Sequence, residues 1–312
     1  MVRVVQIGTG GWGRNHVRVL SHIGVLCAVC DSDKERSRQF SQQYSVNSYD
    51  SVDGLLDGEE FDAAVVCTPT KTHGEIATEL LNRKKHVFVE KPLTYDSGDG
   101  ERLRELADKN GVLLTCGYIE RFNPAVDVVK SLVRSKEYGE LVMLEFHRES
   151  RMPLHIKDVG IIYDTAVHDI DTAMWLFNQT PNVVFASAGR IRHEHEDFSS
   201  IMLGFDDNRV AMILSNWLTS VKVRRFGAVC TEAVISSDFI TQEIRVEKSD
   251  GVLVVDKEKR EPLLLEMQNF VDAVRGTAEL RVKPRHAINV TKIAEAALLS
   301  ARRGVPVYLD LK

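Results

Sequence analysis

A glycine-rich turn near the amino terminus constrains the fold of this chain more than any other feature. Residues 2–7 form a short apolar run, Gly8, Gly10 and Gly13 follow, and residues 13–22 carry apolar side chains at helical spacing. This order predicts a strand, a tight turn and a helix. In such a turn the first glycine permits the bend, the second lets the backbone approach a diphosphate, and the third lets helix and strand pack closely. The amino terminus of the helix then faces the diphosphate.

An acidic residue at the end of the next apolar run indicates which kind of ligand the glycine turn binds. Asp31 lies 23 residues after Gly8, close to the spacing of the carboxylate that binds both ribose hydroxyls of a dinucleotide. Because a carboxylate repels a 2′-phosphate, NAD is favoured over NADP. Arg36 either stacks on the adenine, or weakens the preference for NAD over NADP, or is a solvated helix-surface arginine. The residues expected to bind the cofactor here are Gly8, Thr9, Gly10, Gly11, Trp12, Gly13, Asp31, Ser32 and Arg36.

Strand-like and helix-like segments alternate up to about residue 119. The expected strands after the first are 25–31, 63–67, 86–90 and 113–118, and the expected helices are 33–44, 73–83 and 97–110. Such alternation favours parallel strands joined by right-handed crossovers. We therefore predict an α/β fold with an amino-terminal Rossmann domain, a doubly wound parallel sheet, over residues 1–119.

The pattern changes in the rest of the chain. Expected strands follow one another at 141–150, 182–193, 198–205, 209–217, 228–236, 240–248 and 252–256, and expected helices lie at 123–135, 161–178, 262–275 and 286–303. Asp206, Asp207 and Asn208 are typical of a tight hairpin turn. Consecutive strands with short turns predict a carboxyl-terminal α/β domain with a mainly antiparallel sheet over residues 120–312.

Composition excludes several classes of partner. No run approaches the roughly 18 apolar residues of a membrane span, and a net charge of −5 without a long basic run argues against nucleic acid. The first residues resemble a core strand rather than a secretion signal, so we expect a cytoplasmic protein. The five cysteines, Cys27-x-x-Cys30 included, suit reduced thiols in or beside strands.

Two further strand ends carry polar residues. Ligands of open α/β sheets bind at the carboxyl ends of the strands, so the turn after 63–67 and the Glu90-Lys91-Pro92 turn are candidate cofactor contacts. The first of these turns is alternatively an ordinary strand-to-helix connection capped by Thr72. Proline after Lys91 restricts the backbone of the lysine and can hold its side chain at a defined angle. The residues expected to contact the cofactor from these turns are Thr68, Pro69, His73, Glu90 and Lys91.

A third polar group lies on an apolar helical segment. Asp164, His168 and Asp171 share one face if the segment 161–178 is α-helical. Buried polar groups need partners, so the three residues are either a catalytic group, structural ion pairs or metal ligands. We expect no metal, because no further histidine or cysteine has convincing ligand spacing.

These motifs together resemble the Gfo/Idh/MocA oxidoreductase family over nearly the whole chain. The resemblance rests on the glycine turn, Glu90-Lys91-Pro92 and Gly160…Asp164-x-x-x-His168. It implies a Rossmann domain followed by an α/β domain whose open sheet often forms oligomer contacts, and hence a homodimer or homotetramer. It also implies that Lys91, Asp164 and His168 are catalytic. We expect His168 to be the general base and Lys91 to stabilise the alkoxide, although these two roles are exchangeable.

A narrower resemblance concerns family members that oxidise nucleotide sugars. It rests on the segment 117–124, on Arg151 upstream of Asp158-Val159-Gly160, and on the segment 168–171. It implies NAD-dependent oxidation of a secondary hydroxyl, C3, of a nucleotide sugar such as UDP-N-acetylglucosamine. Structural salt bridges explain the presence of Arg121, Arg148 and Arg151 equally well. The expected substrate-binding residues are Tyr118, Arg121, Asn123, Arg148, Arg151 and Tyr163.

Other functions remain open at this point. An aldose or inositol dehydrogenase of the same family needs hydroxyl-binding groups and no diphosphate clamp. A non-catalytic NAD sensor has little reason to keep Lys91, Asp164 and His168 together. An enzyme that keeps its NAD bound and cycles it between two redox states is also compatible with the sequence.

Overall fold

The computed structural model describes residues 2–153, 156 and 158–311. They fall into two compact units, each with its own sheet and its own buried core. The first comprises Met1–Tyr118 and Leu263–Ile288, and the second comprises Ile119–Pro262 and Asn289–Lys312. The sequence predicted two domains meeting at residues 119 and 120, and it contained no indication that a later segment returns to the first unit.

The first unit is built on a parallel sheet. Among the described residues it has six strands in the order β3-β2-β1-β4-β5-β6, and every neighbouring pair is parallel. This order reverses at β1, as in a doubly wound sheet, so the predicted Rossmann fold is confirmed. The strands are β1 (Val4–Ile7), β2 (Leu26–Cys30), β3 (Asn47–Tyr49), β4 (Ala63–Val66), β5 (His86–Glu90) and β6 (Leu114–Gly117).

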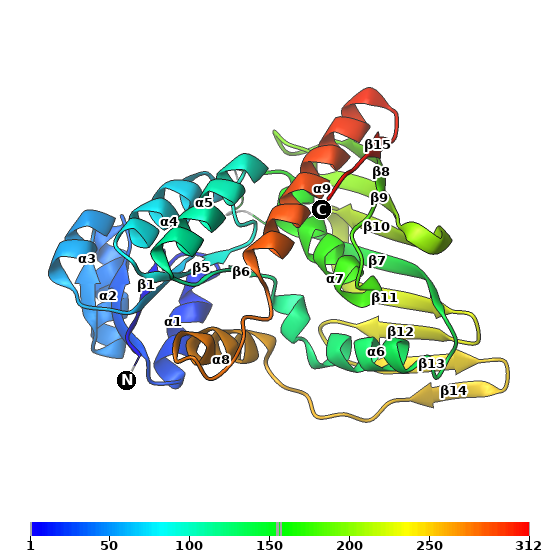
Figure 1. The fold of residues 1–312 in the computed structure, drawn as a ribbon, viewed down its shortest axis with the longest axis horizontal. Helices are drawn as coiled ribbons and strands as arrows, with labels where there is room; N and C mark the ends of the chain where they lie inside the picture. The colour runs from blue at the N-terminus through cyan, green and yellow to red at the C-terminus, as the bar shows by residue number, and fades with distance from the viewer. Residues whose placement is uncertain (1, 154–155, 157, 312) are drawn as a thin grey trace. The chain divides into compact units, whose positions relative to one another are not determined.

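Helices cover both faces of this sheet. Figure 1 shows α4 and α5 side by side on one face, with α1 and α8 on the other. Every side chain of β1 and β4 is buried, which is why the sequence of these strands is continuously apolar instead of alternating. The helices are α1 (Gly13–His22), α2 (Lys34–Tyr44), α3 (Val52–Gly58), α4 (His73–Asn82), α5 (Ser97–Asn110) and α8 (Pro262–Val274), with a 3₁₀ turn at Thr70–Thr72.

The second unit is built on a mostly antiparallel sheet. Among the described residues it has nine strands in the order β14-β13-β12-β11-β7-β10-β9-β8-β15, in which β7 and β10 alone pair in parallel. The predicted hairpin at Asp206–Asn208 joins β9 to β10. The strands are β7 (Leu141–Arg151), β8 (Val183–Gly189), β9 (Phe198–Gly204), β10 (Val210–Asn216), β11 (Leu218–Cys230), β12 (Val234–Asp238), β13 (Ile244–Lys248), β14 (Gly251–Val254) and β15 (Val307–Tyr308).

Helices of the second unit pack on one face of its sheet. Helix α7 contacts β7 and β10, α6 contacts β12, and in α9 the Ser300 hydroxyl accepts the Ala186 N–H of β8 at 2.9 Å. Side chains on the opposite face, such as Phe185 and Leu214, stay exposed. The helices are α6 (Pro124–Ser135), α7 (Val167–Phe177) and α9 (Pro284–Arg303), with a 3₁₀ turn at Ile119–Phe122 and a π-helical turn at Ile162–Ala166; the first residues of α9 belong to the first unit.

One predicted strand is wrong. Residues 228–236 were expected to form a single strand, but the chain turns at Thr231, whose N–H donates to Glu140 O at 3.0 Å. The segment divides between β11 and β12. Most of β11, residues 218–227, was not predicted.

Candidate functional site

The glycine turn has the close approaches that the sequence predicted. Gly8 has a φ of +82°, and a Cβ there would lie 2.5 Å from Cys67 O. A Cβ on Gly13 would lie 2.0 Å from Gly8 O, so α1 begins in contact with the end of β1. No larger residue fits either position without moving backbone. Trp12 and Gly11 are exposed at the tip of the turn, next to the amino terminus of α1, where an anion is stabilised by the helix.

Asp31 lies directly beside this turn. Its Oδ2 accepts the N–H and the hydroxyl of Thr9, both at 2.8 Å, and its Oδ1 accepts the Asp33 N–H at 3.0 Å. Burial alone raises the pKa of Asp31, but these hydrogen bonds and the Arg36 guanidinium outweigh it and hold that pKa below 3.8. Asp31 is therefore ionised at neutral pH. Neighbouring Ser32 is exposed.

Arg36 extends back over the glycine turn. Its Nη1 lies 3.3 Å from Asp31 Oδ2 and would lie 3.1 Å from a Cβ on Gly10. The guanidinium is therefore at the mouth of the turn, on the side where the carboxylate of Asp31 lies. An ionised acceptor, a glycine turn and a helix amino terminus within one unit fit a dinucleotide.

The turn after β4 is tied to the turn after β5. His73, which is buried, places Nε2 2.9 Å from Thr68 O and Nδ1 2.9 Å from Pro92 O. The Thr72 hydroxyl donates to Pro69 O at 2.8 Å and accepts no backbone N–H of α4, so the alternative of a helix capped by the Thr72 side chain is wrong. His73 therefore holds the two turns together, and direct contact of Thr68, Pro69 or His73 with the cofactor stays a prediction.

Glu90 is held by a buried histidine and in turn holds Lys91. His16 Nε2 of α1 lies 2.8 Å from Glu90 Oε1, and the Lys91 N–H donates to Glu90 Oε2 at 3.1 Å. A Cβ on Gly117, opposite Glu90 in β6, would lie 3.0 Å from this carboxylate, so a larger residue there would crowd the Glu90 carboxylate. These contacts link the glycine-turn helix to the backbone of Lys91.

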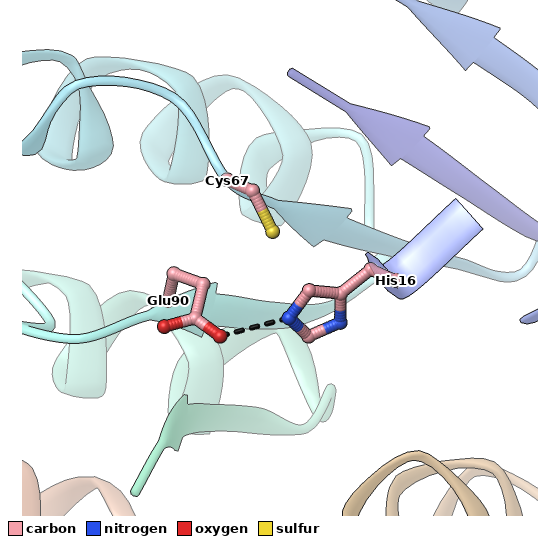
Figure 2. Close-up of side chains that lie close together, drawn as sticks. All are labelled: His16, Cys67 and Glu90. Atoms are coloured by element: carbon pink, nitrogen blue, oxygen red, sulfur yellow. Dashed lines mark hydrogen bonds and ion pairs between the residues drawn. The ribbon is translucent and has the colours of Figure 1, made fainter. Parts of the chain in front are cut away.

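His16, Cys67 and Glu90 form a cluster of possible metal ligands (Figure 2). Among the described residues it is the one such group, and its ligand atoms lie within 4.8 Å of one another. Burial and the Glu90 charge raise the pKa of the Cys67 thiol well above 9.0, so the sulfur stays protonated at neutral pH and is a poor ligand. His16 Nδ1 faces the Met267 sulfur at 3.3 Å. The cluster is better explained as packing, and the absence of a metal stays a prediction.

The segment with Asp164 and His168 is not a continuous α-helix as expected. Residues Ile162–Ala166 form a π-helical turn before α7, so the backbone from Asp164 to His168 is not uniformly α-helical. Both side chains are partly exposed, whereas Asp171 is buried. The predicted single polar face is therefore divided, and Asp171 belongs to a different contact.

Two arginines expected to bind substrate lie in buried ion pairs of the second unit. Arg121 donates from Nε and Nη2 to the two carboxylate oxygens of Asp171 at 2.7 and 2.6 Å. Arg148 donates to Asp169 at 2.7 Å and to Glu120 at 2.8 Å. Both arginines are at most 4% exposed, so these contacts favour a structural role. Substrate binding by either side chain stays a prediction.

The other expected substrate residues differ in exposure. Tyr118, Asn123 and Tyr163 are buried, and Asn123 caps α6 while its amide donates to Phe239 O at 3.0 Å. Arg151 is exposed at the end of β7. Of the six residues predicted from the sequence, Arg151 is thus the one that presents its side chain to solvent in the described structure.

Sequence reasoning missed several residues near the predicted site. His16 was not singled out, although its position three residues after Gly13 places it on the buried side of α1. Lys222 and Arg224 were missed because their strand was not predicted. In β11, Arg224 is the partner of Arg148 in β7, a relationship that follows from register between distant strands and has no local signal.

The fold and the candidate site together define a class of protein. A Rossmann unit with a glycine turn and an ionised acid, joined to an α/β unit with an open mostly antiparallel sheet, is the architecture of NAD-linked oxidoreductases with a separate substrate domain. Residues 2–118 match the model described as "Oxidoreductase family, NAD-binding Rossmann fold", and residues 126–236 match "GFO/IDH/MocA C-terminal domain". The chain belongs to the Gfo/Idh/MocA oxidoreductase family, and its first unit is an NAD-binding domain.

Similar proteins act on two kinds of substrate. The chain is 26% identical to UDP-N-acetylglucosamine 3-dehydrogenase of Acidithiobacillus ferrooxidans, over 88% of each chain. It is 27% identical to scyllo-inositol 2-dehydrogenase (NAD(+)) of Bacillus subtilis, over 100% of this chain and 97% of that protein. A solved structure of the Acidithiobacillus ferrooxidans enzyme superposes with a TM-score of 0.88 at 25% identity, covering 96% of this chain and 98% of the other. In the part of the chain that the structure describes, no helix is long and apolar enough to cross a membrane.

Proposed function

We propose that this oxidoreductase oxidises a secondary hydroxyl, at C3, of a nucleotide sugar such as UDP-N-acetylglucosamine. The observation that carries the proposal is how the polar residues of segment 164–171 are used. Asp169 and Asp171 are buried in arginine ion pairs, whereas Asp164 and His168 remain partly exposed. Two acids thus stabilise the fold, and an acid and an imidazole stay accessible for chemistry.

The catalytic roles follow from what alcohol oxidation requires. When bound, NAD supplies the acceptor for the hydride that leaves the carbinol carbon with its electron pair. The hydroxyl proton passes to the His168 imidazole, which Asp164 orients. The Lys91 ammonium stabilises the developing negative charge on the oxygen, and the roles of Lys91 and His168 are exchangeable. These role assignments rest on the family resemblance at Lys91, Asp164 and His168.

The choice of a nucleotide sugar rests on similarity and on local sequence. The relative from Acidithiobacillus ferrooxidans is similar in sequence and in fold along most of the chain. The segment 117–124 and exposed Arg151 add the narrower resemblance. A second candidate is oxidation of an inositol, because the relative from Bacillus subtilis covers the whole chain at a similar identity.

A substrate panel tests the proposal. The protein is incubated with NAD and with UDP-N-acetylglucosamine, its uronic acid, myo-inositol, scyllo-inositol or free aldoses while reduced cofactor is followed by absorbance. Reduction with a UDP-sugar and not with inositols or aldoses supports the proposal, and the product is then checked for a 3-keto group. Turnover of inositols alone supports the second candidate, and NAD that stays bound through purification supports a cycle between two redox states.

We also propose that the outer face of the second unit's sheet binds further copies of the chain, giving a homodimer or homotetramer. Register places Phe185, Met202 and Met212 side by side across β8, β9 and β10, and Phe185 is 39% exposed. An apolar row of this kind is typical of an interface. A Met212→Glu variant is expected to dissociate to monomers, as measured by light scattering. Ser200→Glu, which adds the same charge at a polar position of the neighbouring strand, is expected to dissociate less.

A further inference from the structure

We propose that Lys222 and Arg224 of β11 form a subsite for an anionic group of the substrate, a phosphate or a carboxylate. The inference rests on the proposed function and deepens it, because it states what distinguishes a charged sugar derivative from a neutral polyol. It concerns residues of the second unit alone. Three features of this unit support the subsite: the irregular shape of β11, the missing counter-charge of Lys222 and Arg224, and the pairing of β11 with the strand that holds the start of α7.

The first feature is an irregularity in β11. Leu218 pairs with Arg151 and Val223 pairs with Glu149, so five residues of β11 span what two residues span in β7. Residues 219–222 are therefore looped out of the ladder. Such bulges redirect side chains and are common beside active sites. Lys222 ends this bulge and is exposed, and Arg224 follows two residues later in the regular ladder, where it pairs with Arg148. The charge of Arg224 acts on Lys222, so the two cations lie within electrostatic reach of each other.

The second feature is the lack of a counter-charge. Lys222 makes no hydrogen bond or ion pair with any residue that the structure describes. Arg224 Nη1 donates to two carbonyl oxygens, Glu149 O at 2.9 Å and Val223 O at 2.8 Å, and its guanidinium contacts no carboxylate within the same described ranges. The nearby acids Asp169 and Glu120 are occupied by Arg148.

The charges of these groups act on one another. Partial desolvation of the ammonium and the positive charges of Arg224 and Arg148 lower the pKa of Lys222, although most of the side chain is exposed. Burial and Arg148 likewise lower the pKa of Arg224, although nearby carboxylates oppose them. Both cations are thus destabilised by their surroundings, and a bound anion relieves that cost through charge-assisted hydrogen bonds. In a structural ion-pair network each charge already faces an opposite charge, so a bound anion would bring no such relief.

The third feature places these cations beside the proposed catalytic helix. The Arg148–Asp169 bond fixes the start of α7 on β7, and Arg224 is the partner of Arg148 on the adjacent strand. His168 immediately precedes Asp169. The Asp164 carboxylate raises the pKa of Arg224, so the two charges lie within electrostatic reach. An anion held by Lys222 and Arg224 would therefore lie near the end of the second unit that carries Asp164 and His168.

Calorimetric titration of the whole protein with NADH present tests the subsite independently of turnover. The probes are UDP, uridine and glucuronate, with glucose as the neutral partner of glucuronate. Wild type is expected to bind at least one anion about 10-fold more tightly than its neutral partner, and Lys222→Ala to weaken that anion about 10-fold without affecting the neutral compound. Lys222→Arg is expected to restore binding. Lys259→Ala, an exposed lysine of the same unit, is the matched control.

The outcomes separate the sources of the anion and the two proposals. A loss confined to UDP assigns the subsite to phosphate, and a loss confined to glucuronate assigns it to carboxylate. Unchanged anion binding in Lys222→Ala, or no preference of wild type for either anion, overturns the subsite. Arg224 also donates to two backbone carbonyl groups, so its replacement can alter the fold as well as the subsite. The titration of Arg224→Lys is therefore accompanied by a measurement of its melting temperature. If wild type oxidises inositols alone while Lys222→Ala still loses UDP binding, the proposed substrate fails and the subsite stands.

Discussion

His16 Nε2 lies 2.8 Å from Glu90 Oε1, although 74 residues separate the two side chains in the sequence. His16 belongs to the helix that follows the glycine turn, and Glu90 ends the strand that precedes Lys91. The other oxygen of the Glu90 carboxylate accepts the Lys91 N–H. The pair thus joins the two parts of the Rossmann unit in which we expect cofactor binding and catalysis, and we expect His16 and Glu90 to position Lys91.

Replacing Glu90 by glutamine removes the negative charge of the carboxylate while keeping the shape of the side chain. Glu90→Gln is expected to lower kcat about 10-fold and to lower the free energy of unfolding by about 2 kcal/mol, because charge-assisted hydrogen bonds to His16 and Lys91 are lost. Steady-state kinetics and urea unfolding measure the two effects. Glu75→Gln, an exposed acid of α4, is the control, and wild-type kcat in Glu90→Gln would contradict the positioning role.

Replacing Asp31 tests the choice of cofactor. Asp31→Asn is expected to raise the Kd for NAD about 10-fold and to narrow the difference between NAD and NADP, because the ionised acceptor and its repulsion of a 2′-phosphate both disappear. Titration with the reduced cofactors, followed by fluorescence, gives the two constants. Asp33→Asn, at the start of α2, is the comparison. Unchanged NAD affinity in Asp31→Asn would show that this carboxylate does not bind the ribose.

The pH dependence of stability provides a separate test of Asp31. Its pKa in the folded protein lies below 3.8, its value in the unfolded chain. The group therefore contributes stability that is fully present above pH about 3.8 and is lost as the pH falls through the folded pKa. The free energy of unfolding of wild type minus that of Asp31→Asn should be constant near pH 6 and shrink below pH 3.8. A difference that grows as the pH falls would contradict the ionised assignment.

The proposed catalytic residues make a prediction about turnover. Lys91→Ala and His168→Ala are each expected to lower kcat at least about 100-fold with the true substrate, since each removes a group that handles the proton or the charge on oxygen. Asp164→Asn is expected to have a smaller effect because it acts through His168. Cofactor binding, measured separately, should persist in His168→Ala. Near wild-type turnover in Lys91→Ala or His168→Ala would disprove the assignment.

Metal removal is expected to have no effect. The one ligand cluster among the described residues contains a Cys67 thiol that burial keeps protonated. Prolonged dialysis against EDTA should leave NAD-linked activity and the melting temperature unchanged. Added zinc should not raise either quantity, and Cys67→Ser, which retains a small polar side chain, should retain most activity. Activity lost to EDTA and restored by zinc would identify a metal site.

Much of the first unit was predictable because its information is local. Most strands of the parallel sheet are short apolar runs, and the spacing of the three glycines lies within one turn. Gly13 is crowded by Gly8 in the same turn, whereas Gly8 and Gly10 are crowded by Cys67 and Arg36 from later segments. The short β3 and α3 escaped prediction because they are only three and seven residues long, too short for a periodic pattern to be recognised. The return of residues 263–288 to the first unit depends on contacts such as the one between His16 and Met267, which no periodicity reveals.

The candidate site was predictable in part. Sequence motifs single out Lys91, Asp164 and His168 as candidate catalytic residues, which stays a prediction, but the segment 161–178 was predicted as one α-helix and begins with a π-helical turn. Side-chain spacing reports which face is apolar and does not report whether a backbone carbonyl bonds four or five residues ahead, so the π-helical turn was missed. The buried partners of Arg121 and Arg148 were equally hidden, because both ion pairs join segments far apart in the sequence.

The sequence alone determined the Rossmann unit, the dinucleotide turn with Asp31, and the family of oxidoreductases to which the chain belongs. These properties depend on steric limits and periodicities that act over a few residues. Tertiary structure decided which charges are matched. It pairs Arg148 with Asp169 and leaves Lys222 without a partner among the described residues, because a strand register set by the whole sheet fixes which side chains meet.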